Sequence, residues 1–390
     1  MKVIIHRGTH QIGGVATEIK TEKTRIIVDM GEELGLNADF VPHPLTITGV
    51  TDGDRACNAI LITHYHGDHI GQLLNAHKDI PIYMGEFAKA ILLATLKDEQ
   101  MELKSRIKDA RTFRPGTPFD IGDISVTPYS IDHSACDSYM FLLEADGKRI
   151  LHTGDFRLHG FRGKALPKIL ARIGKVDTLI TEGTTLSRSA TQTITEYELQ
   201  QKTRAYLEKY KYVFVLCATT NLERICALSK AVPRGKYFVC DGYQGKLIDI
   251  LQEHWGDYSP LYRDIKKVIY GENILAKLQD RGFLMMARDN QQFRDIIGKF
   301  DPSQSIILYS MWDGYRTREN SSIPSFLDIA GTWEPLHTSG HASIDDIKSV
   351  IALSDPSKVV PIHTDNPQML ESICPVETIV YAEDGEEVPV

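Results

Sequence analysis

The 390-residue sequence lacks long apolar runs and closely spaced cysteine pairs. Its longest largely apolar stretches, near 90–96 and 212–218, span seven residues each, the first with Thr95 inside it, well short of the roughly 18 that a membrane helix requires. The six cysteines form no C-x-x-C pair, which argues against a disulfide framework or a zinc knuckle. The charged start, MKVIIHRGTHQ, is typical of a first strand rather than of a signal peptide. We therefore expect a cytoplasmic protein with no membrane segment.

The sequence also lacks a P-loop and a G-x-G-x-x-G motif, so no nucleotide cofactor is indicated. A net charge of -8 argues against an indiscriminate nucleic-acid coat protein, although it leaves room for a local positive site. Hydrophobic residues at 42% and charged residues at 25% are ordinary globular values, which excludes disordered and fibrous classes. Histidine, in contrast, is abundant at 14 residues, and the positions of these histidines decide the interpretation.

The apolar pattern changes near residue 186. Before it, short runs predict strands joined by tight turns, and a helical pattern follows from residue 70. After it, strands alternate with amphipathic helices, the first of which opens with the capping box Thr195 and Glu198. This alternation predicts a parallel sheet covered by helices. From residue 336 the chain returns to a histidine-bearing loop, so we predict an outer domain of residues 1–185 and 336–390 that is interrupted by an inserted domain of residues 186–335.

The strongest motif is His64-Tyr65-His66-Gly67-Asp68-His69, directly after a predicted strand. Residues two apart at a strand end point to one side, so His64 and His66 can grip one ion together. Asp68 and His69 lie where a helix begins and are turned toward a neighbouring position. His133 and Asp155 each follow a further strand. Imidazoles and carboxylates without thiolates suit zinc, or less commonly manganese or iron, in an open site that keeps water as a ligand.

The order of these motifs resembles the metallo-β-lactamase superfamily. Three later motifs resemble its β-CASP group, and the similarity is greatest to ribonuclease J and related RNA-processing nucleases. The resemblance implies an α/β protein, an αββα sandwich with an inserted parallel α/β domain. The segments that carry it are Asp29-Met30-Gly31, the histidine motif, His133, Gly154-Asp155, Thr181-Glu182-Gly183-Thr184-Thr185, Thr338-Ser339-Gly340-His341-Ala342 and Pro361-Ile362-His363-Thr364.

The resemblance also implies two divalent metal ions, with zinc expected and manganese as the alternative. Asp29 would support the site from outside by ordering the histidine loop through hydrogen bonds. The implied ligands are His64, His66 and His133 for the first metal, Asp68, His69 and His363 for the second, and Asp155 as a bridge between both.

The implied activity is that of a metal-dependent hydrolase, a ribonuclease that cleaves phosphodiester bonds in single-stranded RNA. A hydroxide activated by the two metals would attack phosphorus, and His341, oriented by Glu182, would act as the general acid. Asp68 is implied to be catalytic as well as a ligand. His363 favours RNA, because the DNA-cutting members of the family tend to carry valine in this motif. Endonuclease and 5′-exonuclease modes both stay open, and the oligomeric state is not readable from the sequence.

Two other functions stay under consideration. One is a hydrolase of this fold that acts on a small ester, lactone or cyclic phosphodiester. The inserted domain and the additional motifs count against it, since a small substrate needs neither. The other is a non-catalytic RNA-binding or scaffold protein. Degenerate relatives of that kind usually lose metal ligands, whereas every expected ligand is present here.

Weaker signals suggest substrate contacts. Thr219 and Thr220 close a strand and open a helix, so their backbone amides could bind a phosphate, although ordinary helix capping explains them slightly better. Ser339 and Gly340 have the same ambiguity, with better odds because His341 is beside them. The six basic residues of 157–175 line either a phosphate groove or a solvated helix face. Trp312 and Tyr315 could stack on a base, but we expect them to be buried core aromatics.

Overall fold

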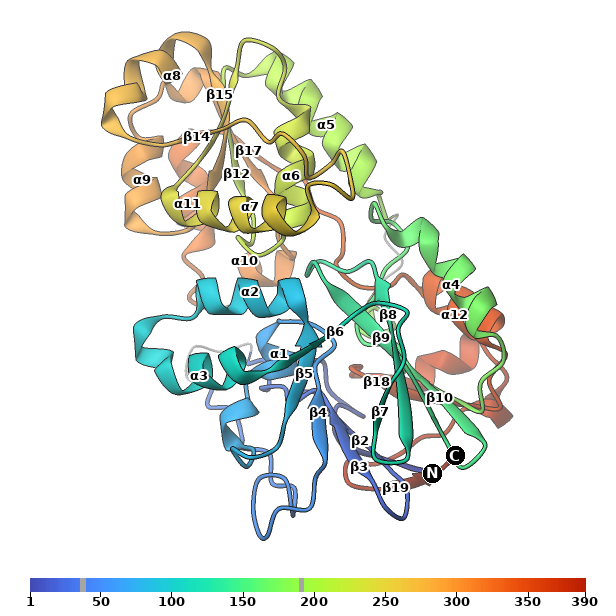
Figure 1. Ribbon diagram of the computed structural model, residues 1–390. Coiled ribbons are helices and arrows are strands. Elements are labelled where there is room, and N and C mark those ends of the chain that lie inside the picture. The colour runs from blue at the N-terminus through green and yellow to red at the C-terminus, as the bar shows by residue number, and fades with distance from the viewer. Residues whose placement is uncertain (36–39, 189–192) are drawn as a thin grey trace. The chain divides into compact units, whose positions relative to one another are not determined.

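The computed structural model describes residues 1–35, 40–188 and 193–390. The chain divides into two compact units, and the divisions fall between residues 192 and 193 and between residues 339 and 340. Both units are drawn in Figure 1. The inserted domain was predicted to begin at residue 186 and the completing segment at residue 336, which is seven and four residues before these divisions.

The first unit contains two sheets. The seven-stranded sheet has the order β19-β1-β2-β3-β4-β5-β6, and the six-stranded sheet has the order β18-β11-β10-β9-β8-β7. The strands of the first sheet are β1 (Lys2–Arg7), β2 (Ala16–Lys20), β3 (Arg25–Val28), β4 (Ala59–Leu61), β5 (Ile82–Gly85), β6 (Arg111–Phe113) and β19 (Glu387–Pro389). Those of the second are β7 (Phe119–Ile121), β8 (Ile124–Ile131), β9 (Ser138–Ala145), β10 (Lys148–His152), β11 (Thr178–Glu182) and β18 (Lys358–Ile362).

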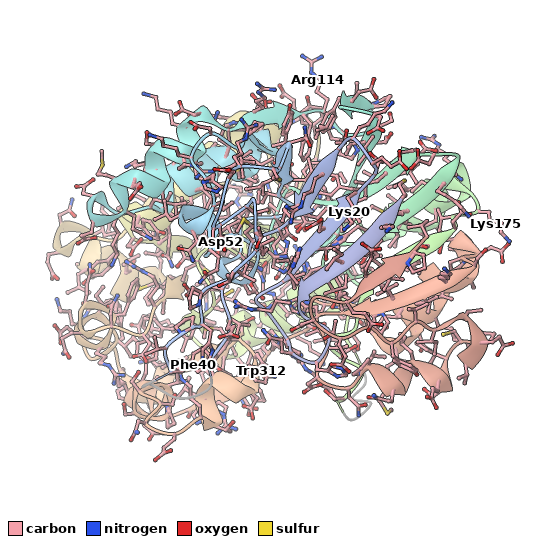
Figure 2. All side chains as sticks on the ribbon, turned by 90° about the horizontal axis from the view of Figure 1, so that it is seen from below. Lys20, Phe40, Asp52, Arg114, Lys175 and Trp312 are labelled. Carbon is pink, nitrogen blue, oxygen red and sulfur yellow. The ribbon has the colours of Figure 1, made fainter. Side chains whose placement is uncertain are left out.

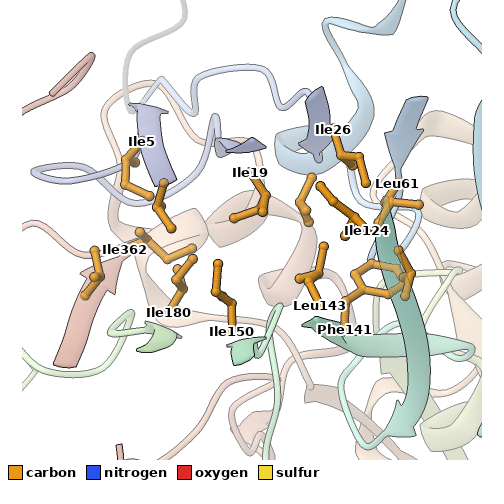
Figure 3. Close-up of a cluster of buried hydrophobic side chains, with 14 of the residues drawn as sticks. Ile5, Ile19, Ile26, Leu61, Ile124, Phe141, Leu143, Ile150, Ile180 and Ile362 are labelled. Carbon is orange, nitrogen blue, oxygen red and sulfur yellow. The ribbon is translucent and has the colours of Figure 1, made fainter. Parts of the chain in front are cut away.

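Apolar side chains from the two sheets form one buried core. In β1 every second residue is buried, as expected for a strand with one face toward the core. Figure 3 shows Ile5, Ile19 and Ile26 of the first sheet facing Leu143 and Ile150 of the second. Burial of such side chains stabilises each by about 1.5–3 kcal/mol relative to exposure in water. The two sheets are therefore a sandwich.

Helices cover the outer faces of the sandwich. The first sheet packs against α2 (Glu86–Thr95) and α3 (Met101–Asp109), and the second against α4 (Leu166–Ile173) and α12 (Ile344–Ser354). The apolar face of α4 buries Leu166, Leu170 and Ile173, which follow the spacing of one helix face. A capping box of Ser343 and Asp346 fixes the start of α12. The predicted αββα sandwich is confirmed.

The second unit is a six-stranded sheet whose neighbouring strands are all parallel, in the order β14-β13-β15-β12-β16-β17. Its strands are β12 (Tyr212–Leu216), β13 (Tyr237–Cys240), β14 (Lys267–Ile269), β15 (Phe283–Ala287), β16 (Ser305–Tyr309) and β17 (Trp333–Pro335). Its helices are α5 (Glu196–Lys209), α6 (Leu222–Ala231), α7 (Gly242–Trp255), α8 (Leu275–Arg281), α9 (Gln291–Ile297), α10 (Asp313–Thr317) and α11 (Ile323–Leu327). The predicted alternation of strands and helices is confirmed, as is the capping box of Thr195 and Glu198.

Two expectations are wrong. The helix predicted from residue 70 is instead a single turn, α1 (Gly67–Ile70), which ends where the predicted helix was to begin. The chain then leaves the helix because the Gln72 amide donates to the Met30 carbonyl at 2.9 Å. Trp312 and Tyr315 are not buried, since 38% and 43% of their surfaces are exposed. Tyr315 belongs to α10, and Trp312 directly precedes that helix. Both residues come after the carboxyl end of β16, so they are not part of a strand that packs in the core.

Surface side chains are mostly polar. Arg114 and Lys175 are exposed and point away from the ribbon in Figure 2. Within the described ranges, no helix combines the length and the apolar character needed to cross a bilayer.

Candidate metal centre

The predicted metal ligands all follow strands of the sandwich and meet in the first unit. His64 and His66 lie between β4 and α1, and α1 itself contributes Asp68 and His69. The other three ligands follow strands of the second sheet, which are β8 for His133, β10 for Asp155 and β18 for His363. Their nitrogen and oxygen atoms lie close enough together to hold metal ions. The structure thus brings together all seven residues that the sequence singles out.

His64, His66 and His133 form what we call the three-histidine group. His66 Nδ1 lies 3.1 Å from His64 Nε2 and 3.3 Å from His133 Nε2. Two nitrogen ligands of one tetrahedral zinc ion, each about 2.05 Å from the metal, are separated by roughly 3.3 Å. His133 Nδ1 lies 2.6 Å from the carbonyl oxygen of Gly340, which turns Nε2 toward the other two rings. The spacing and the donor chemistry fit a divalent ion such as zinc.

Asp68, His69 and His363 form the acidic group. His363 Nε2 lies 3.2 Å from Asp68 Oδ2, and His69 Nε2 lies 4.0 Å from the same oxygen. One carboxylate and two imidazoles also suit a divalent ion. These three side chains thus offer a second place for a cation, separate from the three-histidine group.

Asp155 lies between the two groups. Its Oδ2 is 3.8 Å from His64 Nε2 and 3.9 Å from His133 Nε2 on one side. On the other side it is 3.2 Å from His69 Nε2 and 3.8 Å from His363 Nε2. A single carboxylate oxygen therefore faces donors of both groups, which is the arrangement that a bridging ligand requires.

Burial controls protonation in the three-histidine group. It is the largest cause that lowers the pKa of all three imidazoles, to about 4 for His66 and well below the usual range for His64 and His133. Nearby imidazoles add to the effect for each ring. The three rings are therefore neutral at neutral pH, which is the state that binds a metal ion.

Charge controls protonation in the acidic group. Burial alone would lower the pKa of His69 and His363, but the Asp155 carboxylate, with Asp29 or Asp68, outweighs it and raises both values. Burial would also raise the pKa of Asp68, but the hydrogen bond with His363 and the charge of His69 outweigh it and lower the value. In the absence of a cation, this group is held together as carboxylate and imidazolium pairs.

Asp29 holds the segment from Thr63 to His69 in place through hydrogen bonds. Its Oδ1 accepts from the Thr63 amide at 2.8 Å, and its Oδ2 accepts from the Thr63 hydroxyl and from His69 Nδ1, each at 2.7 Å. Its backbone has a φ of 61°, and that of His363 has a φ of 54°. Such left-handed conformations in residues other than glycine persist where surrounding contacts enforce them, and they gather at functional sites. Gly31 is required here, because a Cβ would lie 1.7 Å from the Asp68 carbonyl oxygen.

His341 and Glu182 lie beside the ligand groups. Glu182 Oε1 accepts from the amides of Phe156 at 2.9 Å and Ala342 at 3.3 Å, so the buried carboxylate is fixed. Its Oε2 lies 3.1 Å from His341 Nδ1, and the same nitrogen is 3.6 Å from Asp155 Oδ2. The His341 side chain is 21% exposed, in contrast to the fully buried His64 and His133. The ring can therefore meet a substrate while its other nitrogen is held.

The sequence analysis missed several residues that hold the predicted ligands in place. The Thr184 hydroxyl lies 2.8 Å from His363 Nδ1. Asp132 accepts from Arg157 Nε at 2.7 Å, and both side chains have no exposed surface. Asp132 adjoins His133, and Arg157 comes two residues after Asp155, so this ion pair joins two ligand loops. Arg157 is therefore not part of a phosphate groove. Thr184 lies inside a motif that the sequence already marked, but nothing in the pattern signals a pair between residues 132 and 157.

The predicted substrate-binding residues fall in two places. The Gly340 carbonyl contacts His133, as described above, so Gly340 positions a predicted metal ligand. Thr219, Thr220 and Ser339 belong to the second unit. Thr219 and Thr220 follow β12 and are partly buried. Their role in binding a substrate stays a prediction.

Comparisons with known families agree with this site. Residues 24–210 match the family described as Beta-lactamase superfamily domain, and residues 327–371 match the Zn-dependent metallo-hydrolase RNA specificity domain. The first matched segment contains the predicted ligands from His64 to Asp155, and the second contains His341 and the predicted ligand His363. Residues 24–210 therefore carry a metallo-β-lactamase domain, and the predicted resemblance of the chain to this superfamily and to the ribonuclease J group is confirmed. The family and the histidine and aspartate cluster together indicate divalent metal ions.

Curated relatives are ribonucleases by name. The chain is 22% identical to Ribonuclease J of Helicobacter pylori over 98% of its own length and 60% of that protein. It is 23% identical to Ribonuclease J 1 of Streptococcus pyogenes over 91% of its length and 67% of that protein. It is also 26% identical to Probable RNase MJ4 of Methanocaldococcus jannaschii over 47% of its length and 45% of that protein. The chain thus spans about 60% of the length of the first of these relatives.

A solved structure shares the whole fold. It is a protein of unknown function from Enterococcus faecalis V583, with a TM-score of 0.80, 21% sequence identity and 99% coverage of both chains. The similarity covers both units and supports the fold alone.

Proposed function

We propose that this protein is a metal-dependent ribonuclease that hydrolyses phosphodiester bonds in single-stranded RNA. The observation that carries the proposal is the position of Asp155 Oδ2 between the three-histidine group and the acidic group. Two ligand groups that share one carboxylate suit a pair of divalent ions, and such pairs are characteristic of phosphodiester-cleaving enzymes. The RNA-specificity match and the ribonuclease relatives support RNA as the substrate.

We further propose zinc as the bound metal, with manganese as the alternative. Imidazole nitrogens and carboxylate oxygens without thiolates fit both ions. Each group would hold one ion, with Asp155 as a ligand to both. When bound, the two ions lower the pKa of water and stabilise negative charge on a phosphodiester. Asp68 is held ionised by its partners, so it serves as a ligand rather than as a proton donor.

His341 is proposed to be the general acid. Its Nδ1 donates to Glu182, which leaves Nε2 to donate a proton to the departing oxygen of the substrate. Glu182 holds the ring in one orientation, because its own carboxylate is fixed by two backbone amides. The partial exposure of His341 gives the substrate access to the ring. Without a proton from this residue, negative charge would accumulate on the leaving group.

The proposed compartment is the cytoplasm. All six cysteines are buried, and no disulfide joins them in the described part of the chain; thiols that stay reduced are usual in a reducing compartment.

A cleavage assay with one strand made both as RNA and as DNA tests the proposal. The zinc- or manganese-loaded protein is mixed with the 5′-labelled strand, and product lengths are read on a sequencing gel. We expect the RNA to be cut, the DNA to resist, and a chelator to abolish the reaction. Cleavage of neither strand by a metal-loaded protein that turns over small esters, lactones or cyclic phosphodiesters would contradict the proposal.

A further inference from the structure

The sheet of the second unit has a switch point at the carboxyl ends of two neighbouring strands, where open parallel sheets commonly bind ligands. β12 and β16 are neighbours, but the chain leaving β12 runs through α6 to β13 on one side, while the chain leaving β16 runs to β17 on the other. In open α/β sheets, ligands bind outside the carboxyl ends of strands at such a switch in direction. The two loops that begin there are 217–221 after β12 and 310–312 after β16.

Two aromatic side chains, Trp312 and Tyr315, are exposed after the carboxyl end of β16. Trp312 is 38% exposed and Tyr315 is 43% exposed, and Trp312 is labelled in Figure 2. Their ring centroids are 5.4 Å apart with planes at 84°, an edge-to-face pair. By contrast, Phe214, Phe283 and Phe293 of the same unit are fully buried. Two adjacent, partly exposed aromatic rings therefore lie at a switch point, where a ligand is expected.

The Trp312 backbone is held firmly. Its carbonyl accepts from the Tyr309 hydroxyl at 2.8 Å, and the neighbouring Ser310 amide donates to the Leu216 carbonyl at 2.9 Å. The Ser310 carbonyl accepts from Arg224 Nη1 at 3.2 Å, and Arg224 is itself buried in an ion pair with Glu196. These contacts tie the loop to β12 and α6, so the indole is presented from a rigid support.

Gly314 gives the indole ring its place. A Cβ at this position would lie 2.3 Å from Cη2 of Trp312 and within 2.5 Å of two further ring carbons. Real Cβ contacts are not that short, so any other residue would displace the ring. The position of Trp312 therefore depends on a glycine that the short helix α10 does not otherwise need.

The charges around the pair favour a phosphate group. Asp313 is paired with Arg316 at 2.7 Å, which leaves its carboxylate neutralised. The guanidinium of Arg318 lies 6.0 Å from the Tyr315 ring centroid and is exposed. Among the described residues, no ion pair occupies Arg318. An exposed cation beside aromatic rings is the combination that binds single-stranded nucleic acid through stacking and backbone contact.

We propose that Trp312 and Tyr315 form a base-stacking subsite for single-stranded RNA, with Arg318 contacting an adjacent phosphate. This inference rests on the proposed function and adds a recognition surface on the second unit. Stacking on an aromatic ring does not depend on base identity, so the subsite would hold RNA of any sequence.

Initial rates of RNA cleavage by the metal-loaded full chain give the first test. Stacking of one base is strong enough that Trp312→Ala should raise KM about tenfold or more while kcat changes less than about twofold. Gly314→Ala should raise KM as well, because it displaces the indole, whereas Trp312→Phe should retain most of the affinity. Tyr197→Ala and Tyr258→Ala remove exposed aromatics elsewhere in the same unit and should leave KM unchanged.

A fluorescence measurement gives a test that does not depend on cleavage. The sequence has three tryptophans, so the double variant Trp255→Phe/Trp333→Phe reports on Trp312 alone. Addition of a short single-stranded RNA to chelator-treated protein should quench this emission, and an oligomer of abasic ribose phosphate should not. Quenching in a protein that cuts no RNA would contradict the proposed function but support the subsite. Normal cleavage with unchanged KM in Trp312→Ala and no quenching would overturn the subsite alone.

Discussion

The three-histidine group and the acidic group differ in what controls the protonation of their imidazoles. In the first, burial removes protons from the imidazoles, so three neutral nitrogens face one another without charge. In the second, carboxylates raise the pKa of His69 and His363, so the metal-free group is filled by internal ion pairs. The difference indicates that a cation entering the first group displaces no proton, whereas a cation entering the second competes with protons.

Substitution of Asp155, whose carboxylate faces both groups, should reduce metal content and cleavage more than any other change. Asp155→Asn takes away the carboxylate that faces both, so we expect loss of metal from both groups and a fall in RNA cleavage of about 10³-fold or more. Metal content by mass spectrometry and cleavage rates measure both effects. Asp120→Asn changes an exposed aspartate of the same unit and should alter neither. If Asp155→Asn kept its full metal content, Asp155 would not be a ligand shared by the two groups.

Separate substitutions should empty one group at a time. His66→Ala removes a ligand of the three-histidine group, and Asp68→Asn removes one of the acidic group. Each variant should lose about one of two metal equivalents, because the other group keeps its own side chains. Metal titration by calorimetry counts the remaining sites. If either variant lost both equivalents, the two groups would be a single cooperative site rather than two different ones.

The same two variants should differ in their response to pH. His66→Ala retains the acidic group, where the raised pKa of His69 and His363 means that a cation displaces protons. Its affinity should weaken as pH falls from 8 to 6, by up to about tenfold per unit for each proton displaced. Asp68→Asn retains the three-histidine group, whose imidazoles are already neutral, so its affinity should change little. Equal pH slopes in the two variants would refute the comparison.

The smallest expected effect is on stability. Burial lowers the pKa of His152 to about 4, although this histidine is outside both groups. Between this value and the unfolded value near 6.5, the unfolded chain binds the extra proton, so stability is lost as pH falls. His152 should therefore cost about 2 kcal/mol of stability between pH 7.5 and pH 5. Urea unfolding of metal-free His152→Gln should show a weaker pH dependence, and an unchanged one would exclude this role.

Much of the site was predictable because short motifs at strand ends encode it. His64, His66, Asp68 and His69 lie within six consecutive residues, and the order of the later motifs matched a known family. The sandwich and the parallel sheet followed from apolar patterns that depend only on local sequence.

What could not be predicted depends on contacts between distant segments. The ion pair of Asp132 and Arg157 requires two loops to meet, so the sequence offered Arg157 as one more surface cation. The helix expected from residue 70 is cut short by a hydrogen bond to the Met30 loop. The exposure of Trp312 follows from its place beyond the end of a strand, whereas residue type alone favours a core position.

The most direct test of the account is the variant His341→Ala, examined for RNA cleavage and metal content in the same preparation. His341 contacts Glu182 and lies beside the ligands, but it belongs to neither group. We predict that cleavage of single-stranded RNA is abolished while both metal equivalents stay bound. Loss of metal in this variant, or cleavage at the rate of the unmodified protein, would contradict the account.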